Sequence, residues 1–174
     1  NRRGWLQRMC GLKYFNVFGP NEAHKGDMMS LVPRAYRQIQ DTGRLQLFRS
    51  HHPDYADGGQ LRDFLYVKDA VAATLHLART PAANGLFNVG SGVATRWRDL
   101  GAAIFEALGK PVHIDYIDMP EHLRGKYQYK TCADISRLRA AGFQRPMTPV
   151  ADAVADYVGN YLVPDRRLGD EAPA

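Results

Sequence analysis

Hydrophobic residues along this chain form short runs and helical stripes that alternate with each other. Apolar runs bounded by turn residues predict strands at 12–17, 45–48, 61–67, 86–89, 112–117 and 127–131. The run at 12–17 shows no alternation, which predicts a buried strand. Apolar residues three and four apart predict helices at 28–39, 69–79, 95–108, 133–141 and 149–161. Strands alternating with helices predict an α/β fold with parallel pairing.

The ends of these helices carry recognisable capping residues. Gly43, Gly109 and Gly142 each stand just past a predicted helix, where a left-handed residue is favoured. Thr95 is the expected N-cap of the third helix, and Pro149 the expected first residue of the last one. The tail from residue 164 is expected to fray. The first element is a strand with no strand–helix unit before it, so the predicted sheet is incomplete.

Composition and charge narrow the class of protein. The chain has 174 residues and is 45% hydrophobic, which suits one globular domain or a small domain with pieces of another. It has no apolar run of about 20 residues and no signal-peptide pattern at its start, so we expect no membrane partner. Two distant cysteines, Cys10 and Cys132, predict free thiols in a reducing cytoplasm. The net charge of +5 is scattered along the sequence, which argues against a nucleic-acid surface and suits a phosphate-bearing small substrate.

Motifs for an independent oxidoreductase are missing from the sequence. Dinucleotide binding needs a glycine-rich turn such as GxGxxG, and Gly90-Ser91-Gly92 lacks the third glycine. We interpret that triplet as a structural turn. No tyrosine is followed four positions later by lysine, and no HExxH or paired Cys/His spacing predicts a metal site.

Polar residues near strand ends are the candidates for chemistry, and each has an ordinary alternative. Asn16 can contact a substrate hydroxyl or a cofactor, or simply form a turn. Lys25, in the charged stretch 24–27, can move a proton or be solvated. Arg62 lies inside an apolar strand, where it needs either a diphosphate or a structural pair with Asp63 or Asp69. The segment 124–129 mixes cations with aromatic rings, as in a phosphate-and-base contact or in a solvated basic loop.

Five segments together carry a family resemblance: FNVFGPNEAHKG, LRDFLYVKDA, GLFNVGSG, RGKYQYKTCADI and LRAAGF. In this order they resemble the C-terminal half of the ADP-L-glycero-D-manno-heptose 6-epimerase family, which is of the extended short-chain dehydrogenase/reductase type. The second and third segments are shared across extended short-chain dehydrogenases. The HKG step and the RGKYQY segment narrow the resemblance to the heptose epimerases.

The resemblance implies an incomplete Rossmann-type parallel sheet plus a small α/β substrate-binding domain. Residues 1–26 and 61–92 would supply late strands and a helix of the Rossmann domain, 27–60 and 93–163 the substrate-binding domain, and 164–174 the tail. The implied reaction interconverts the two C6 epimers of ADP-heptose by transient oxidation with NADP, for the inner core of lipopolysaccharide. The implied full-length enzyme is a cytoplasmic homo-oligomer.

Site residues follow from the same resemblance. Lys25 matches a catalytic acid/base, and Val17 lies against the nicotinamide end of the cofactor. The residues expected to contact substrate are Asn16, Asp27, Arg34, Phe48, Arg49, Ser50, His51, Arg62 and Tyr127. Asp27 stands where many relatives have serine, and Arg34 where some have histidine, so this sequence departs from the pattern there.

Two other readings of the sequence stay open. One is a different extended nucleotide-sugar epimerase or dehydratase. The other is a non-catalytic fragment that binds sugar nucleotides. Because the glycine-rich turn and the Tyr-x-x-x-Lys motif are missing, we expect this chain by itself to be inactive.

Overall fold

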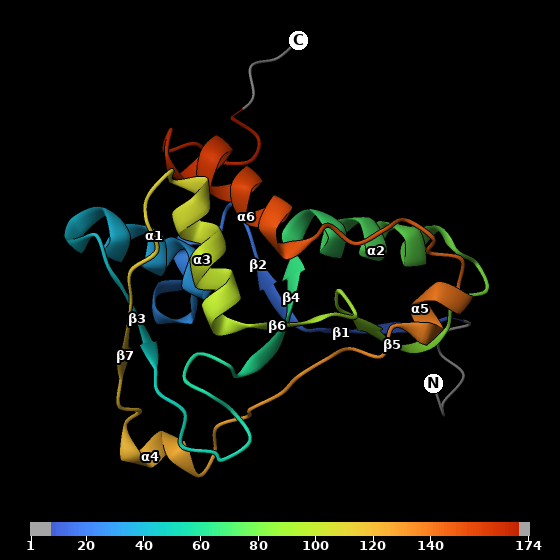
Figure 1. The fold of residues 1–174 in the computed structure, drawn as a ribbon. Helices are drawn as coiled ribbons and strands as arrows, with labels where there is room; N and C mark the ends of the chain where they lie inside the picture. Colours follow the sequence, from blue (N-terminus) through green and yellow to red (C-terminus); the bar gives the residue numbers. More distant parts are fainter. Residues whose placement is uncertain (1–7, 171–174) are drawn as a thin grey trace.

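A computed structural model describes residues 8–170 of the chain (Figure 1). Its strands are β1 (Cys10–Tyr14), β2 (Asn16–Phe18), β3 (Leu45–Phe48), β4 (Leu61–Tyr66), β5 (Gly85–Val89), β6 (Ala94–Arg96) and β7 (Ile114–Ile117). Its helices are α1 (Leu31–Thr42), α2 (Val67–Arg79), α3 (Trp97–Ala107), α4 (Glu121–Arg124), α5 (Ser136–Ala140) and α6 (Val150–Tyr157), with a kinked 3₁₀ segment η1 (Ala23–Met28) and a π-helical turn η2 (Val158–Leu162). The predicted α/β class is confirmed.

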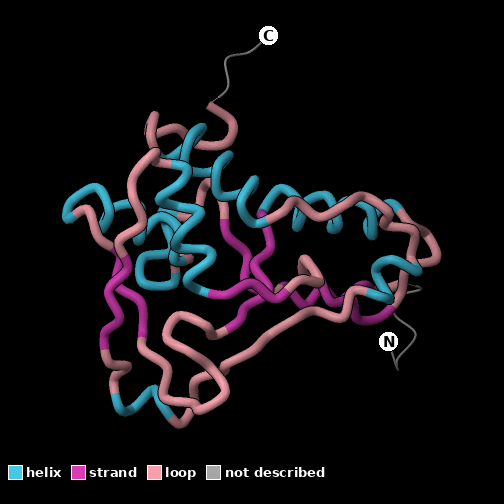
Figure 2. The backbone as a smooth tube through the Cα atoms, viewed as in Figure 1, coloured by secondary structure: helices cyan, strands magenta, loops and turns pink. Residues whose placement is uncertain are grey.

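Three small sheets carry the strands, and most pairs are parallel (Figure 2). β1 pairs with β5, β2 with β4, and β3 with β7, all parallel, while β6 is antiparallel to β4. Each parallel pair is joined through helices, as parallel pairing requires. No helix in residues 8–170 is long and apolar enough to cross a bilayer.

The predicted strand 12–17 is two strands that meet at Phe15. The Phe15 amide donates to the Val89 carbonyl at 3.0 Å, which ends the ladder with β5, and Asn16 then pairs with Phe64 on β4. The prediction that this run is buried is wrong for its middle. Lys13, Tyr14 and Asn16 are exposed. Within the described residues β1 pairs with one strand only, β5, which leaves its other edge uncovered by a strand.

Two hydrophobic clusters lie on opposite faces of β4. Phe64 and Tyr66 pack with α1, α3, α6 and β3, whereas Leu65 packs with α2, α5 and β5. Side chains alternate between the two faces of a strand, so one strand can serve both clusters. β4 therefore connects the two halves of the structure.

Several predicted helix ends moved because tertiary contacts replaced local ones. Thr95 lies in β6 opposite Arg62, so it is not an N-cap, and the first amides of α3 donate to the carbonyls of Gln60 and Gly58. Pro149 is the N-cap of α6 rather than its first residue. Segment 127–131 contributes only a bridge from Lys130 to Leu61. Sequence patterns did not reveal η1 or α4.

The first part of the tail makes backbone and side-chain contacts with the rest of the structure. Arg166 donates its amide to the Tyr161 carbonyl at 2.8 Å, and Leu168 exchanges two hydrogen bonds with the side chain of Asn21. Fraying of the tail from residue 164 stays a prediction. Residues 1–7 and 171–174, which the expected domain pieces and tail also include, lie outside the described residues.

Candidate functional site

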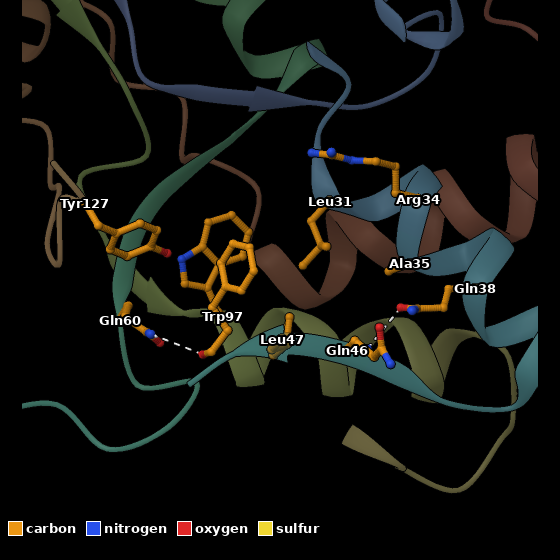
Figure 3. Close-up of a pocket in the computed structure, with 10 residues that line it drawn as sticks. Leu31, Arg34, Ala35, Gln38, Gln46, Leu47, Gln60, Trp97 and Tyr127 are labelled. Atoms are coloured by element: carbon orange, nitrogen blue, oxygen red, sulfur yellow. Dashed lines mark hydrogen bonds between the residues drawn. The ribbon is translucent and has the colours of Figure 1, made fainter. Parts of the chain in front are cut away.

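A cavity of about 460 Å³ lies between the start of α1, β3 and the start of α3 (Figure 3). Its wall is partly aromatic and partly made of amides: Leu31, Arg34, Ala35, Gln38, Gln46, Leu47, Phe48, Gln60, Trp97 and Tyr127. Three predicted substrate contacts, Arg34, Phe48 and Tyr127, meet here although they are far apart in sequence. Such a lining suits a planar ring that is held by a few hydrogen bonds.

Arg62 stands beside this cavity, with only 8% of its surface exposed. Its guanidinium lies 5.0 Å from the centre of the Tyr127 ring and 5.9 Å from that of Trp97, and it donates to the Leu61 carbonyl at 2.8 Å. Burial lowers the pKa of Arg62. The electrostatic interaction with the Tyr127 hydroxyl oxygen raises it and so offsets part of this decrease.

No carboxylate of the described residues forms an ion pair with Arg62. The carboxylate of Asp63 accepts from Ser91, Gly92 and Ala133 instead. The carboxylate of Asp69 accepts from the Thr148 amide and faces Arg145 at 3.5 Å. The structural pairing considered from the sequence is therefore wrong.

A second cavity of about 270 Å³ opens onto Arg62. Leu123, Lys126, Tyr127 and Gln128 complete its wall, so the basic aromatic segment 124–129 meets the buried arginine. Lys126 adds a second cation to this wall. A buried guanidinium without a carboxylate, next to a second cation, suits a phosphate or diphosphate.

Tyr127 separates the two cavities. Burial raises the pKa of its hydroxyl, while the Arg62 charge and the Trp97 indole N–H oppose the rise. The indole N–H faces this hydroxyl but makes no hydrogen bond of normal geometry in the described residues. The hydroxyl therefore stays protonated at neutral pH and can donate to a ligand.

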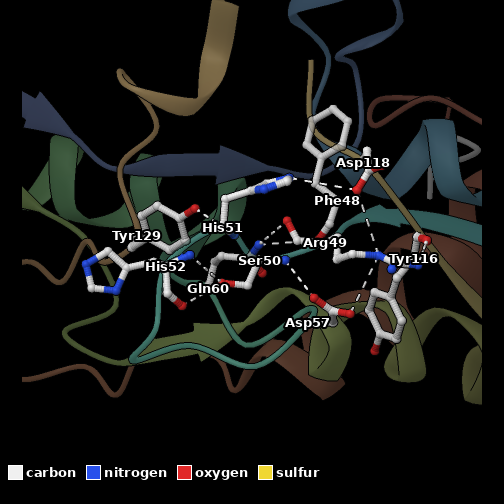
Figure 4. Close-up of polar contacts among 10 residues, drawn as sticks. All are labelled: Phe48, Arg49, Ser50, His51, His52, Asp57, Gln60, Tyr116, Asp118 and Tyr129. Atoms are coloured by element: carbon white, nitrogen blue, oxygen red, sulfur yellow. Dashed lines mark hydrogen bonds and ion pairs between the residues drawn. The ribbon is translucent and has the colours of Figure 1, made fainter. Parts of the chain in front are cut away.

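Loop 49–60 carries the next three predicted residues (Figure 4). Arg49 lies 3.9 Å from Asp57 and 4.0 Å from Asp118, and it donates to the Tyr116 carbonyl. Carboxylates already surround the Arg49 charge, so it is a weaker anion ligand than Arg62.

Ser50 and His51 are held by their backbones. The Ser50 amide donates to Asp57 at 2.7 Å, and the His51 amide donates to the Tyr129 hydroxyl at 3.1 Å. The rings of His52 and Tyr55 pack on Tyr129, which in turn contacts Tyr127 with ring centres 5.3 Å apart. A chain of aromatic contacts thus runs from the loop to the ring that covers Arg62.

Asn16 and Val17 lie where β2 follows β1. The Asn16 amide donates to the Asp63 carbonyl at 3.0 Å and to the Thr131 hydroxyl at 3.3 Å. Its side-chain oxygen accepts no hydrogen bond within the described residues, so it is available to a ligand donor. Val17 is half-buried and packs against the hydrophobic cluster formed by Leu65 with α2, α5 and β5.

Lys25 and Asp27 lie on η1, and both are exposed. Gly26, with φ of 53°, kinks the segment between them. No contact joins Lys25 to the cavity within the described residues. Arg34 on α1 links the cavity to the segment after η1. It lines the cavity and donates to the carbonyls of Met29 and Ser30, which directly follow η1.

Several lining residues had no recognisable signal in the sequence. Gln60 is 1% exposed and donates to the Phe48 carbonyl at 3.3 Å, and its Oε1 is buried without a partner. Trp97 has the spacing of a core residue of its helix, and it both packs against the core and lines the cavity. For Gln60, the only signal in the sequence was its position as a polar residue directly before the apolar strand 61–66.

Two backbone amides of the Gly90-Ser91-Gly92 turn already donate to a buried carboxylate of the same chain. Asp63 takes the amides of Ser91 and Gly92, and a Cβ at Gly90 would lie 2.4 Å from the Ala133 Cβ. The amides that could cradle a pyrophosphate are therefore in use, which agrees with the interpretation of a structural turn.

Comparison with known proteins identifies similar sequences. The NAD dependent epimerase/dehydratase family matches residues 2–90. An ADP-L-glycero-D-manno-heptose-6-epimerase of Nitratidesulfovibrio vulgaris (strain DP4) is 53% identical over 161 residues, which are 92% of this chain and 50% of that protein. One from Fusobacterium nucleatum is 42% identical, over 87% of this chain and 48% of that protein. The chain thus spans about half the length of the curated relatives it matches.

Solved structures show the same architecture. The Helicobacter pylori ADP-L-glycero-D-manno-heptose-6-epimerase has a TM-score of 0.73 and 26% identity, covering 88% of this chain and 44% of that one. A UDP-N-acetylglucosamine 4-epimerase from Methanobrevibacter ruminantium has a TM-score of 0.74 at 24% identity, over 90% of this chain and 46% of that one. The second match shows the fold alone.

Proposed function

Because this chain belongs to the NAD dependent epimerase/dehydratase family, we propose that it is the C-terminal part of a nucleotide-sugar epimerase. The proposed reaction interconverts ADP-D-glycero-D-manno-heptose and ADP-L-glycero-D-manno-heptose by transient oxidation at C6 with NADP. The product would serve lipopolysaccharide inner-core synthesis. The relatives at 53% and 42% identity, both named for this activity, support the choice.

The observation that carries this proposal is Arg62, buried without a carboxylate beside an aromatic cavity. Burying an unpaired charge costs free energy unless a counter-ion arrives. A sugar nucleotide brings a diphosphate for Arg62 and Lys126, and an aromatic base for the cavity that Phe48 and Trp97 line. In this arrangement Tyr127 donates to the ligand between the two, and Gln60 offers its unpartnered buried oxygen to a base amine.

In the proposed reaction Lys25 is a proton-transferring residue. Asn16 would bind a sugar hydroxyl through its side-chain oxygen, and Asp27 would accept from another. Arg34 would add charge near the ligand while holding the backbone after η1. Arg49, Ser50 and His51 would line the pocket edge, with Arg49 contributing least because of Asp57 and Asp118.

The described residues do not by themselves fit a dinucleotide. Asp63 occupies the amides of the Gly-x-Gly turn, and the sequence has no other glycine-rich turn after a strand. Only the strand end at Asn16 and Val17 offers a contact, to the nicotinamide end of the cofactor. NADP binding is therefore proposed for a protein with the full length of the relatives.

We assign residues 1–26 and 61–92 to the Rossmann domain and residues 27–60 and 93–163 to the substrate-binding domain. The free thiols of Cys10 and Cys132 suit a cytoplasmic protein. The full-length enzyme is proposed to be a homo-oligomer.

The experiment is to assay a full-length protein containing this segment with each ADP-heptose epimer separately and to follow C6 inversion by NMR. Conversion of both epimers toward one equilibrium mixture supports the proposal. Turnover of UDP-sugars but not ADP-heptose would show a different nucleotide-sugar epimerase. Binding of ADP without turnover of any sugar nucleotide would show a binding protein.

A further inference from the structure

Glu22 is a buried carboxylate for which the proposed reaction has no use. It lies in the turn between β2 and α1, and only 3% of its surface is exposed. Ion pairs within residues 8–170 do not include it. A charge in such a place is costly unless hydrogen bonds compensate it.

Hydrogen bonds to Glu22 join the two ends of the turn 19–30. Its Oε2 accepts from the Ser30 amide at 2.7 Å, and its Oε1 accepts from the Ser30 hydroxyl at 2.8 Å. The Gly19 amide points to the same Oε1 at 3.4 Å. The Glu22 carbonyl also accepts from the Lys25 amide at 3.0 Å, so one residue contacts the start, middle and end of the turn.

α6 supplies a further contact to this carboxylate. Burial first, and then the neighbouring Glu22 charge, raise the pKa of the Tyr157 hydroxyl on α6. Tyr157 belongs to the core of α1, α3 and α6. Glu22 therefore lies next to a core residue of α6.

The turn itself has little else to hold it. η1, which carries Lys25 and Asp27, has no buried residue, and Gly26 interrupts its helical backbone. Its packing on the core is therefore small, and its position depends on the polar contacts at its ends. Arg34 adds two hydrogen bonds to the carbonyls of Met29 and Ser30. These lie at the C-terminal end of the turn, where Glu22 also binds Ser30.

We propose that Glu22 is a positioning residue that holds the turn 19–30, and through it Lys25, in the place where Lys25 transfers a proton. The part that concerns Lys25 rests on the proposed function. A shift of about 1 Å in a reacting group can reduce the rate about 100-fold. Loss of the carboxylate therefore acts on the chemical step while substrate binding at Arg62 is retained.

The test replaces Glu22 with glutamine in a full-length protein containing this segment. Glutamine keeps the shape but presents an NH₂ group to donors that need an acceptor. We expect kcat to fall about 10- to 100-fold and KM to rise by a smaller factor, because Asp27 lies on the same turn whereas Arg62 and Tyr127 do not. Hydrogen exchange should accelerate at 19–30 and stay unchanged at the cavity residues Gln60 and Trp97. Ser30→Ala, which removes one of the bonds, should give a smaller effect in the same direction and covers the case in which Glu22→Gln does not fold.

The matched control is Glu106→Gln, the same chemical change on the exposed face of α3, which should change neither quantity. A kcat within about threefold of wild type in Glu22→Gln overturns the proposal, as does faster exchange throughout the molecule instead of in the turn. If wild type converts neither epimer, the proposed function fails. Exchange confined to 19–30 would then still establish that Glu22 holds the turn, and exchange unchanged there would overturn both.

Discussion

Replacing Arg62 with methionine should separate ligand binding from folding. Methionine keeps most of the apolar stem of arginine but removes the charge. Truncating one partner of a buried charge pair costs about 2–5 kcal/mol of binding free energy. At about 1.4 kcal/mol per factor of ten, the Kd for ADP should rise roughly 30-fold to several thousand-fold.

Stability should respond differently because Arg62 is unpaired without ligand. The contacts of its guanidinium with the Tyr127 and Trp97 rings stabilise the fold by about 0.5–2 kcal/mol each. The cost of burying its charge offsets this contribution. We therefore expect the free energy of unfolding of the ligand-free protein to change by less than about 2 kcal/mol, in either direction.

Calorimetric titration with ADP measures the affinity, and thermal melting with and without ADP measures the coupling. ADP should raise the Tm of wild type by mass action and leave that of Arg62→Met nearly unchanged. Arg96→Met is the matched control, because Arg96 is half exposed and pairs with Asp99 at 3.6 Å on the surface. An Arg62→Met protein with unaltered ADP affinity and a much lower Tm would refute the reasoning and make Arg62 a structural residue.

The other predictions test the proton-transferring residue, the cofactor and the scaffold. Lys25→Met in a full-length protein should lower kcat by about 10²–10⁴-fold with little change in KM, and by more for one epimer than the other; a kcat within about threefold of wild type would make Lys25 a solvated lysine. The isolated 174-residue chain should bind NADP weakly or not at all, because the described residues lack a pyrophosphate cradle; submicromolar binding by calorimetry would contradict this. Asp63→Asn should lower the free energy of unfolding by about 1.5–3 kcal/mol, since the buried carboxylate accepts from Ser91, Gly92 and Ala133; an unchanged urea midpoint would argue against that role.

Local patterns in the sequence determined most of the regular elements. Helix α1 ends at Gly43, whose φ of 71° permits the left-handed cap, as the glycine after an apolar stripe predicted. β3 has the predicted bounds, and β4 and α2 lie within two residues of theirs. These elements were predictable because spacing and capping act between residues close together in the chain.

Tertiary structure decided which strands pair and how the chain changes partner. Nothing in the run 12–17 indicates that it leaves β5 for β4 at Phe15, because both partners lie more than 40 residues downstream. Thr95 has the side chain of an N-cap, but strand pairing with Arg62 took precedence over its local preference. The sequence also lacked any signal for the contact of Leu168 with Asn21, because the two residues are far apart in the chain.

In the candidate site too, the sequence indicated some residues and only the tertiary structure revealed others. The residue types in FNVFGPNEAHKG and LRDFLYVKDA, together with the family resemblance, singled out Asn16, Lys25 and Arg62. Only the folded structure showed that Arg62 contacts two aromatic rings and forms no ion pair within residues 8–170. It also showed that Gln60 and Trp97 line the cavity and that Glu22 closes the turn bearing Lys25. A sequence specifies which side chains can carry charge or donate a proton. Whether a buried charge has a partner depends on residues brought together from distant segments, and packing alone determines that.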